Sequence, residues 1–222
     1  MKKKVFALLS VVVLLVCTHY AVAESAALAS MSEEELFSLR LEINEELAAR
    51  RQAQDVPDGA TIADLFPDPV LAKCIRDEVG AFSVTDAVTQ EKLDAVSTIS
   101  FTNTDSGIRS LEGIGYLHGM WQLILHSQDQ LQAVPDEIGE CVSLRRIMLS
   151  CKSVASIPDS ICNLPLLSEL ILSYSSISEL PADIGNLTAL KELNISHTNI
   201  TSLPESIYTL TLDIFRREGL DL

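Results

Sequence analysis

A constant spacing of 23 residues dominates the second half of this sequence. Four dipeptides, each an apolar residue followed by proline, stand at Val134-Pro135, Ile157-Pro158, Leu180-Pro181 and Leu203-Pro204, so that neighbouring pairs are always 23 residues apart. A fixed period of this length is typical of repeat proteins, in which each repeat is one structural unit that stacks on the next. We therefore expect a stack of short units rather than an ordinary globular domain.

Alignment on these prolines extends the pattern in both directions. Units begin at residues 96, 120, 144, 167 and 190, and we number them coils 1 to 5. Apolar residues at the first, fourth and sixth positions predict a short parallel strand, and the Pro-x-x-Ile-x-x-Leu part predicts a return segment on the opposite, convex side. One unit cannot bury its own leucines, whereas stacked units share a core. The sequence thus predicts an α/β fold, a right-handed leucine-rich repeat solenoid of about five repeats of 23–24 residues, over residues 96–212.

Residues 61–95 have a different pattern, which predicts a helical N-terminal cap. Asp68 is a suitable helix N-cap with Pro69 at the first helical position, and Gly80 can end that helix. A second short helix is expected at Gln90-Glu91-Lys92-Leu93. A solenoid needs such a terminal unit because the core of its first coil would otherwise be open to water.

Both regions resemble a known family. Residues 181–190, Pro-Ala-Asp-Ile-Gly-Asn-Leu-Thr-Ala-Leu, are similar to the common leucine-rich repeat consensus. Leu-Phe-Pro-Asp-Pro at residues 65–69, Val-Thr-Asp at 84–86 and Gly-Ile-Gly-Tyr-Leu at 113–117 resemble the cap and first repeat of bacterial internalin-type surface proteins. The resemblance covers about residues 61–210. It implies a protein that binds host or partner proteins, usually through the concave strand face.

Two departures from the repeat pattern affect the expected fold. The consensus has asparagine at the ninth position, but this chain has Thr104, Gln128, Lys152, Ser175 and Thr198 there. A lysine cannot accept a hydrogen bond, so an irregular ladder between coils is expected. Asp213 stands where a sixth unit would place a leucine, so residues 213–222 are expected to be a C-terminal tail. Apolar side chains at its start could cover the last coil.

The first 23 residues have the pattern of a secretory signal peptide. Three lysines (residues 2–4) precede an apolar run over residues 5–16, and Ala21-Val22-Ala23 has the small residues that a signal peptidase requires. The apolar run is too short to anchor the chain in a bilayer. An alternative, lipoprotein cleavage before Cys17, would need a small residue in place of Val16. The pattern predicts a protein that is secreted or associated with the cell surface, without a stable membrane span after cleavage.

The net charge of the sequence is −15, and removal of residues 1–23, with three lysines and no acids, would change it to −18. So acidic a chain repels phosphate backbones, and nucleic acid is not expected as a partner.

Residues 24–60 are predicted to form an acidic amphipathic helix and a linker. Ser32 and Glu35 have capping-box spacing, and Leu36, Leu39, Ile43 and Leu47 share one face of a helix that runs to about residue 51. This helix could dock on the repeats, oligomerise the chain or remain free. The linker covers residues 52–60.

Four cysteines remain after signal cleavage, Cys74, Cys141, Cys151 and Cys162. An even number in an exported chain permits disulfides, and the sequence leaves their pairing open. Cys141 occupies a leucine position of the repeat and is interpreted as a small buried hydrophobe. Neither zinc-ligand spacing nor any other metal site is present in the sequence.

The residues that face away from the core predict a binding surface. The fifth position reads Ser100, Ile124, Met148, Ile171 and Asn194, an apolar stripe across the middle coils. The candidate partner-binding residues, of types enriched at interface centres, are Trp121, Ile124, His126, Arg145, Met148, Ile171, Tyr174 and His197. An ordinary sheet face with incidental apolar residues is the alternative interpretation.

Catalytic motifs are absent from the sequence. It contains neither Gly-x-Ser-x-Gly, nor His-Glu-x-x-His, nor a phosphate-binding glycine loop. We therefore predict no enzyme activity and no cofactor. The predicted function is a secreted or surface-associated module that binds a protein partner through its concave face. An assembly protein that oligomerises through residues 32–51 is the alternative.

Overall fold

The computed structural model describes residues 55–102 and 107–219. We describe the compact unit that begins at residue 56. The predicted signal peptide, the 32–51 helix and residues 52–54 of the linker lie outside the described residues and stay predictions. Among the described residues, no helix is long and apolar enough to cross a membrane.

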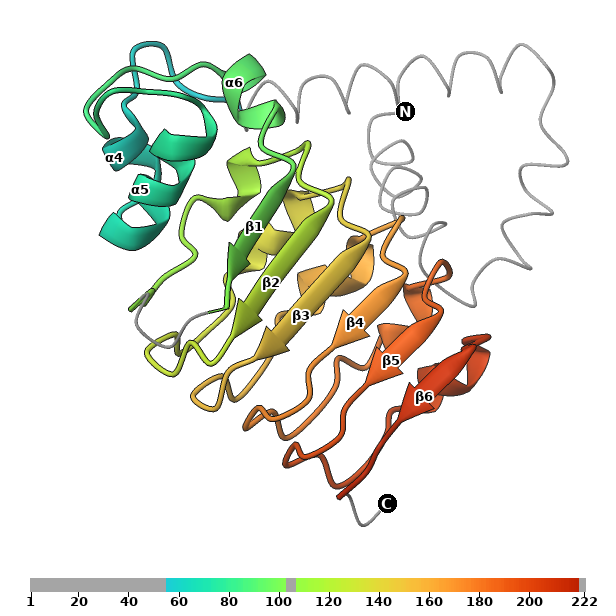
Figure 1. The fold of residues 1–222 in the computed structure, drawn as a ribbon. Coiled ribbons are helices and arrows are strands. Elements are labelled where there is room, and N and C mark those ends of the chain that lie inside the picture. Colours follow the sequence, from blue (N-terminus) through green and yellow to red (C-terminus); the bar gives the residue numbers. More distant parts are fainter. Residues whose placement is uncertain (1–54, 103–106, 220–222) are drawn as a thin grey trace, which may run out of the picture. The chain divides into compact units, whose positions relative to one another are not determined.

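The described part begins with a cap of three short helices, α4 (Ile62–Leu65), α5 (Pro69–Glu78) and α6 (Gln90–Asp94) (Figure 1). Asp68 caps α5 as predicted, with its side chain accepting from the Val70 and Leu71 amides. Helix α6 confirms the second predicted helix. Helix α4 was not predicted, although Thr61 and Asp64 form a capping box at its start.

Six parallel strands form one sheet in chain order. They are β1 (Thr98–Phe101), β2 (Gln122–His126), β3 (Arg146–Ser150), β4 (Glu169–Ile171), β5 (Glu192–Asn194) and β6 (Ile214–Arg216). Equal positions of successive coils lie opposite each other, as in the row Ile99, Leu123, Ile147, Leu170, Leu193. This register confirms the repeat phase read from the sequence.

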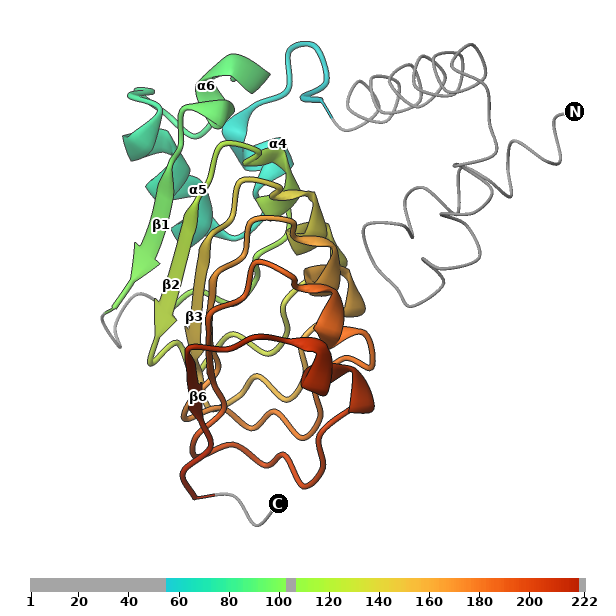
Figure 2. The same cartoon turned by 90° about the vertical axis from the view of Figure 1, so that its right-hand side faces the viewer.

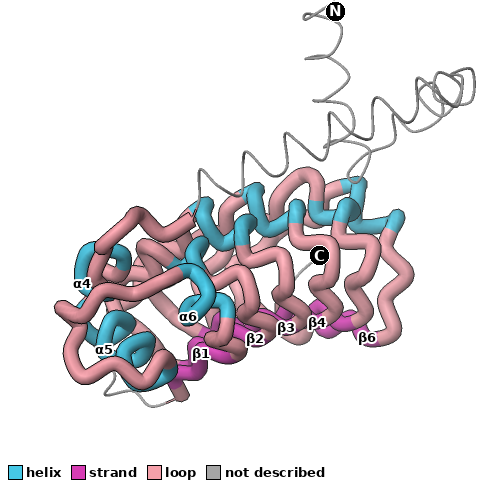
Figure 3. The backbone as a smooth tube through the Cα atoms, turned by 90° about the horizontal axis from the view of Figure 1, so that it is seen from above, coloured by secondary structure: helices cyan, strands magenta, loops and turns pink. Residues whose placement is uncertain are grey.

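Short 3-10 helices return the chain on the other side of the solenoid. They are η1 (Ile114–Tyr116), η2 (Asp136–Glu140), η3 (Asp159–Asn163), η4 (Ile184–Asn186) and η5 (Glu205–Thr209). Figures 2 and 3 show the strands along one side of the stack and these helices along the other. The predicted return segments are thus confirmed.

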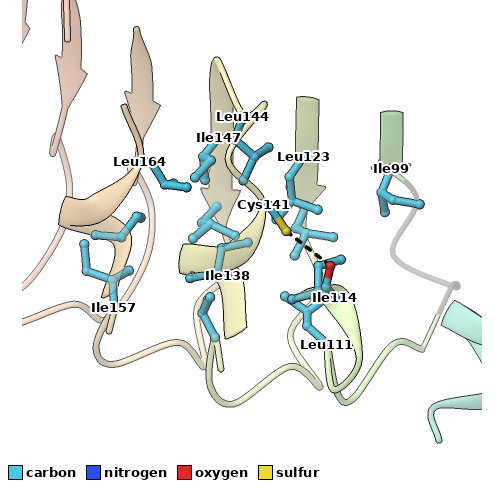
Figure 4. Packing of buried hydrophobic residues seen from close by; sticks show 14 of the residues in the cluster. Ile99, Leu111, Ile114, Leu123, Ile138, Cys141, Leu144, Ile147, Ile157 and Leu164 are labelled. Atoms are coloured by element: carbon cyan, nitrogen blue, oxygen red, sulfur yellow. Dashed lines mark hydrogen bonds between the residues drawn. The ribbon is translucent and has the colours of Figure 1, made fainter. Parts of the chain in front are cut away.

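The repeat leucines and isoleucines between these two layers form one continuous core. The fourth-position residues Ile99, Leu123, Ile147, Leu170 and Leu193 are all fully buried. Figure 4 shows how side chains from the strands and from the 3-10 helices meet between the layers. Cys141, also fully buried, stands among them, so its interpretation as a small hydrophobe at a leucine position is confirmed.

The expected end of the sheet was wrong by one strand. β6 continues the sheet beyond residue 212, with Leu193 opposite Phe215. This register makes Leu212, not residue 213, the first position of a sixth coil. Asp213 is then at the second position, and its amide donates to the carbonyl oxygen of Lys191, the second-position residue of coil 5. The shift of one residue hid the strand from the sequence pattern.

The ladder between the coils is irregular, as predicted, although its detail differs in coil 3. Lys152 is exposed, and the neighbouring Cys151 turns inward and donates from its thiol to the Leu125 carbonyl oxygen of coil 2. Ser175 and Thr198 instead donate to carbonyl oxygens within their own coils. Cys151 thus takes the inward place that the exposed Lys152 does not fill.

One carboxylate joins the cap to the repeats. Asp68 is 5% exposed, and its second oxygen accepts from the Arg109 and Ser110 amides of coil 1, at 2.8 and 3.1 Å. Nearby, Gly113 has φ +87°, and an added Cβ would overlap the Leu65 carbonyl oxygen. The cap and the first coil are therefore held by specific contacts rather than by apolar packing alone.

Candidate protein-binding face

We call the sheet surface that points away from the core the strand face. In its middle row, Ile124 lies opposite Met148, and Met148 lies opposite Ile171. The predicted apolar stripe is thus a set of direct neighbours, with Ser100 and Asn194 at its two ends. Ile124 and Met148 are half-buried, but Ile171 is only 9% exposed, so it offers a partner less surface than expected.

Trp121 and Arg145 lie at the second position, at the start of the strands. The Arg145 amide donates to the Trp121 carbonyl oxygen at 2.8 Å, which places these residues side by side on coils 2 and 3. Trp121 is 41% exposed. A large aromatic side chain with this much exposure, next to an exposed arginine, is typical of an interface anchor.

Tyr174 and His197 lie beyond the opposite ends of the strands. Their rings are stacked, with centroids 4.7 Å apart and planes at 20°. Both residues have left-handed backbones, with φ of 61° and 56°. Such conformations are uncommon for residues other than glycine and often mark functional positions. His126 is the last residue of β2 and is exposed on the same edge.

The predicted residues therefore do not converge on one point. Trp121 and Tyr174 are six positions apart along the strand direction and two coils apart across it, a separation of about 20 Å. The apolar stripe lies between them. The strand face thus has three parts, an edge with Trp121 and Arg145, a central stripe, and an opposite edge with the Tyr174–His197 stack.

Charges differ between the two sides of the solenoid. On the strand face, the Arg146 Nε lies 3.1 Å from Glu169, and the Arg216 Nε lies 3.9 Å from Glu192. The five 3-10 helices contain only acidic charges, at Asp136, Glu137, Glu140, Asp159 and Glu205. The strand face is nearly balanced in charge, and it surrounds an apolar stripe, a composition typical of an interface rather than of a solvating surface.

The described residues were compared with two kinds of reactive site, a metal centre and an activated thiol. No group of three or more His, Cys, Asp or Glu side chains in this part of the chain could hold a metal ion. Burial raises the pKa of the Cys74, Cys141 and Cys151 thiols, the opposite of the shift that activates a nucleophile.

A shallow groove of about 330 Å³ lies elsewhere, along the Pro-bearing turns of coils 3 to 5. Ile157, Leu180 and Leu203 line it together with Asp159 and Glu179. It contains none of the predicted site residues. Ile157 and Leu180 in this groove are 7 and 6% exposed, whereas Ile124 and Met148 on the strand face are only half-buried.

Sequence reasoning missed the serines of the strand face. Ser150, Ser173 and Ser196 stand at the seventh position of coils 3 to 5 and are 7, 7 and 5% exposed. Their short side chains form a row between the apolar stripe and the Tyr174–His197 stack. Each of these serines follows a buried residue, Leu149, Leu172 or Ile195, and this alternation can be read from the sequence. Small polar residues are common at strand ends, however, so the alternation alone did not identify the serines as candidate site residues.

Comparisons with known proteins agree with this architecture. Residues 51–94 match the family model described as bacterial adhesion/invasion protein N terminal, and residues 142–200 match the leucine rich repeat model. Internalin H of Listeria monocytogenes is 33% identical over 85 residues, which are 38% of this chain and 15% of that protein. Internalin C of the same species is 34% identical over 83 residues, 37% of this chain and 27% of that protein.

Solved structures include similar chains. An internalin from Listeria monocytogenes has a TM-score of 0.47 at 23% identity, over 74% of this chain and 54% of that chain. A leucine-rich repeat protein from Leptospira interrogans has a TM-score of 0.43 at 21% identity, over 60% and 40% of the two chains.

The sheet, the 3-10 helices and the helical cap define a leucine-rich repeat protein. Over the matched residues, its cap and repeats are similar to those of the internalins. Each curated match spans less than a third of the relative's length.

Proposed function

We propose that this protein is a non-enzymatic module that binds a protein partner through its strand face, which we infer to be the concave face of the solenoid. The observation that carries the proposal is the row Ile124–Met148–Ile171, which lies on the outer surface of the sheet rather than in the core. Apolar side chains that are held in a row on a rigid sheet can be desolvated by a partner without ordering cost.

Trp121 and Arg145 on one edge, and Tyr174, His197 and His126 on the other, are proposed to extend this contact. Side chains of these types carry much of the energy at known interfaces. The acidic 3-10 side supports the choice of face, since a partner there would have to neutralise several carboxylates.

We further infer that the protein is exported and works in the extracellular space or at the cell surface. The signal pattern of residues 1–23 and the adhesion/invasion family model that matches residues 51–94 support this location. Fractionation of native cells should recover the processed protein outside the cytoplasm. Recovery of the unprocessed chain in the cytoplasm alone would contradict the inference.

A capture experiment tests the binding function. The immobilised protein should retain a partner from its native surroundings that an Ile124→Glu variant does not retain, because a buried charge in the stripe opposes desolvation. Tyr208→Ala is the control, since Tyr208 is 81% exposed and lies on η5, on the opposite side. Equal capture by all three proteins would contradict the proposal.

A further inference from the structure

The Tyr174–His197 stack follows the repeat of the solenoid. Both residues are at the eighth position of their coils, and their centroid separation of 4.7 Å equals the usual spacing of neighbouring strands. Gly219 is at the same position in the sixth coil, and an added Cβ there would lie 2.8 Å from the His197 Nδ1. The backbone of Gly219 therefore covers the side of the His197 ring that faces away from Tyr174. The other ring, Tyr174, is 59% exposed.

Coil 3 interrupts this row of eighth-position residues. Ser127, Tyr174, His197 and Gly219 are all left-handed, whereas Cys151 is not among the residues with positive φ. Cys151 is fully buried, and its thiol donates to the Leu125 carbonyl oxygen. Coil 3 thus places no eighth-position side chain beside the Tyr174 ring. We call the surface of coil 3 between Ser127 of coil 2 and Tyr174 of coil 4 the coil-3 slot.

Two serines form the floor of the slot on the strand face. Ser150 and Ser173 are each 7% exposed, and neither hydroxyl makes a hydrogen bond to another described residue. Side chains alternate along a strand, so both serines point to the same face as Met148 and Ile171, two residues before each of them. The two hydroxyl oxygens are not among the fully buried side-chain atoms without a partner, so water can reach them in the free protein. A ligand that covers the serines must therefore offer a polar edge or leave the hydroxyls unpaired.

We propose that the coil-3 slot receives the side chain of a tryptophan or tyrosine from the protein partner. A planar ring at the next coil spacing would continue the stack on Tyr174, and its indole N–H or phenol O–H would reach the serine hydroxyls. A purely apolar side chain would leave these hydroxyls unpaired. The identification of the occupant as part of a protein rests on the proposed function, because the apolar stripe beside the slot is the surface that such a partner would cover.

The test uses the full chain and small probes, followed by NMR. N-acetyl-tryptophanamide and N-acetyl-tyrosinamide should produce saturable shifts of the Tyr174 ring and of the Ser150 and Ser173 amides. N-acetyl-leucinamide and methyl β-glucoside are the comparison probes and should give no saturable shift there. Equal shifts with the leucine amide, or shifts with the glucoside alone, would overturn the proposal.

Variants make the assignment specific. Tyr174→Ala should weaken binding of the tryptophan probe at least about fivefold, the value of one aromatic stacking contact. Tyr174→Phe should retain binding, and Tyr208→Ala should not change it. An unchanged affinity in Tyr174→Ala, with its fold confirmed by circular dichroism, would overturn the slot. That result would leave the proposed function untouched, because the capture experiment depends on Ile124 and not on Tyr174.

Discussion

The thiol of Cys141 donates a hydrogen bond to the carbonyl oxygen of Ile114, 3.2 Å away on the neighbouring coil (Figure 4). Burial, aided by the negative charge of Glu140, raises the pKa of this thiol to about 12. A cysteine in the place of a repeat leucine thus fills the core and also satisfies a carbonyl at a 3-10 helix. The thiol is protonated in the folded state at any ordinary pH.

The raised pKa predicts a loss of stability at high pH. The unfolded chain releases the Cys141 proton near pH 9, while the folded chain keeps it up to about pH 12. The free energy of unfolding should therefore be unaffected by this group below pH 9, and should fall above it by up to about 1.4 kcal/mol per pH unit. Urea unfolding between pH 8 and 10.5 measures the slope. Cys141→Leu, which restores the repeat residue, should have a shallower slope, and an identical slope would contradict the assignment.

Asp68 should be a large contributor to stability. Its carboxylate accepts two amides of α5 and two of coil 1, so Asp68→Ala removes the helix cap and leaves donors of the cap junction unpaired. We expect a loss of about 2–4 kcal/mol in the free energy of unfolding. Asp77→Asn, an exposed change on the same helix, is the control and should cost less than about 0.5 kcal/mol. Similar losses in the two variants would show that Asp68 does not join the cap to coil 1.

Alanine substitutions at two glycines distinguish the cost of backbone strain from the cost of a steric clash. Gly107 and Gly113 have φ of +70° and +87°, but an added Cβ at Gly107 meets nothing within 4 Å, whereas one at Gly113 overlaps Leu65. Gly107→Ala should cost about 1–2 kcal/mol, the penalty of the left-handed conformation. Gly113→Ala should cost clearly more and should expose the cap to limited proteolysis. Equal stability of the two variants would mean that the cap can move without loss.

Lys152→Asn tests the inward turn of Cys151. The substitution restores the asparagine of the repeat consensus in the sequence, yet the Lys152 side chain is exposed and the ladder position is held by Cys151. Thermal unfolding should therefore show a change below about 0.5 kcal/mol. A clear stabilisation would indicate that residue 152 can enter the ladder after all.

The fold was predictable because its signal is repeated. Each coil shows the same apolar positions, so errors in one coil are corrected by the others, and residues such as Leu123 and Leu170 could be assigned to the core. The exceptions lie where the period changes by a single residue. Cys151, at the eighth position of coil 3, makes the inward hydrogen bond that is expected of the ninth-position residue. Leu212 begins the sixth coil one residue earlier than the repeat length predicts.

The binding face was predictable only as a set of outward positions. Periodicity assigns Ile124, Met148 and Trp121 to the outer surface, but it contains no information on how neighbours cover one another, and Ile171 is more buried than expected for that reason. The stack of Tyr174 on His197 depends on left-handed backbones beyond the strand ends, and spacing alone does not reveal these.

The most direct test of the account is the affinity of the captured partner for strand-face variants, measured by isothermal titration calorimetry. Met148→Glu, at the centre of the apolar stripe, should weaken binding at least about 30-fold, or roughly 2 kcal/mol, and Trp121→Ala should weaken it by a similar factor. Tyr208→Ala on the acidic side should bind as the unmodified protein does. If Met148→Glu and Trp121→Ala keep full affinity while Tyr208→Ala loses it, the partner binds the opposite side and the proposed function is wrong.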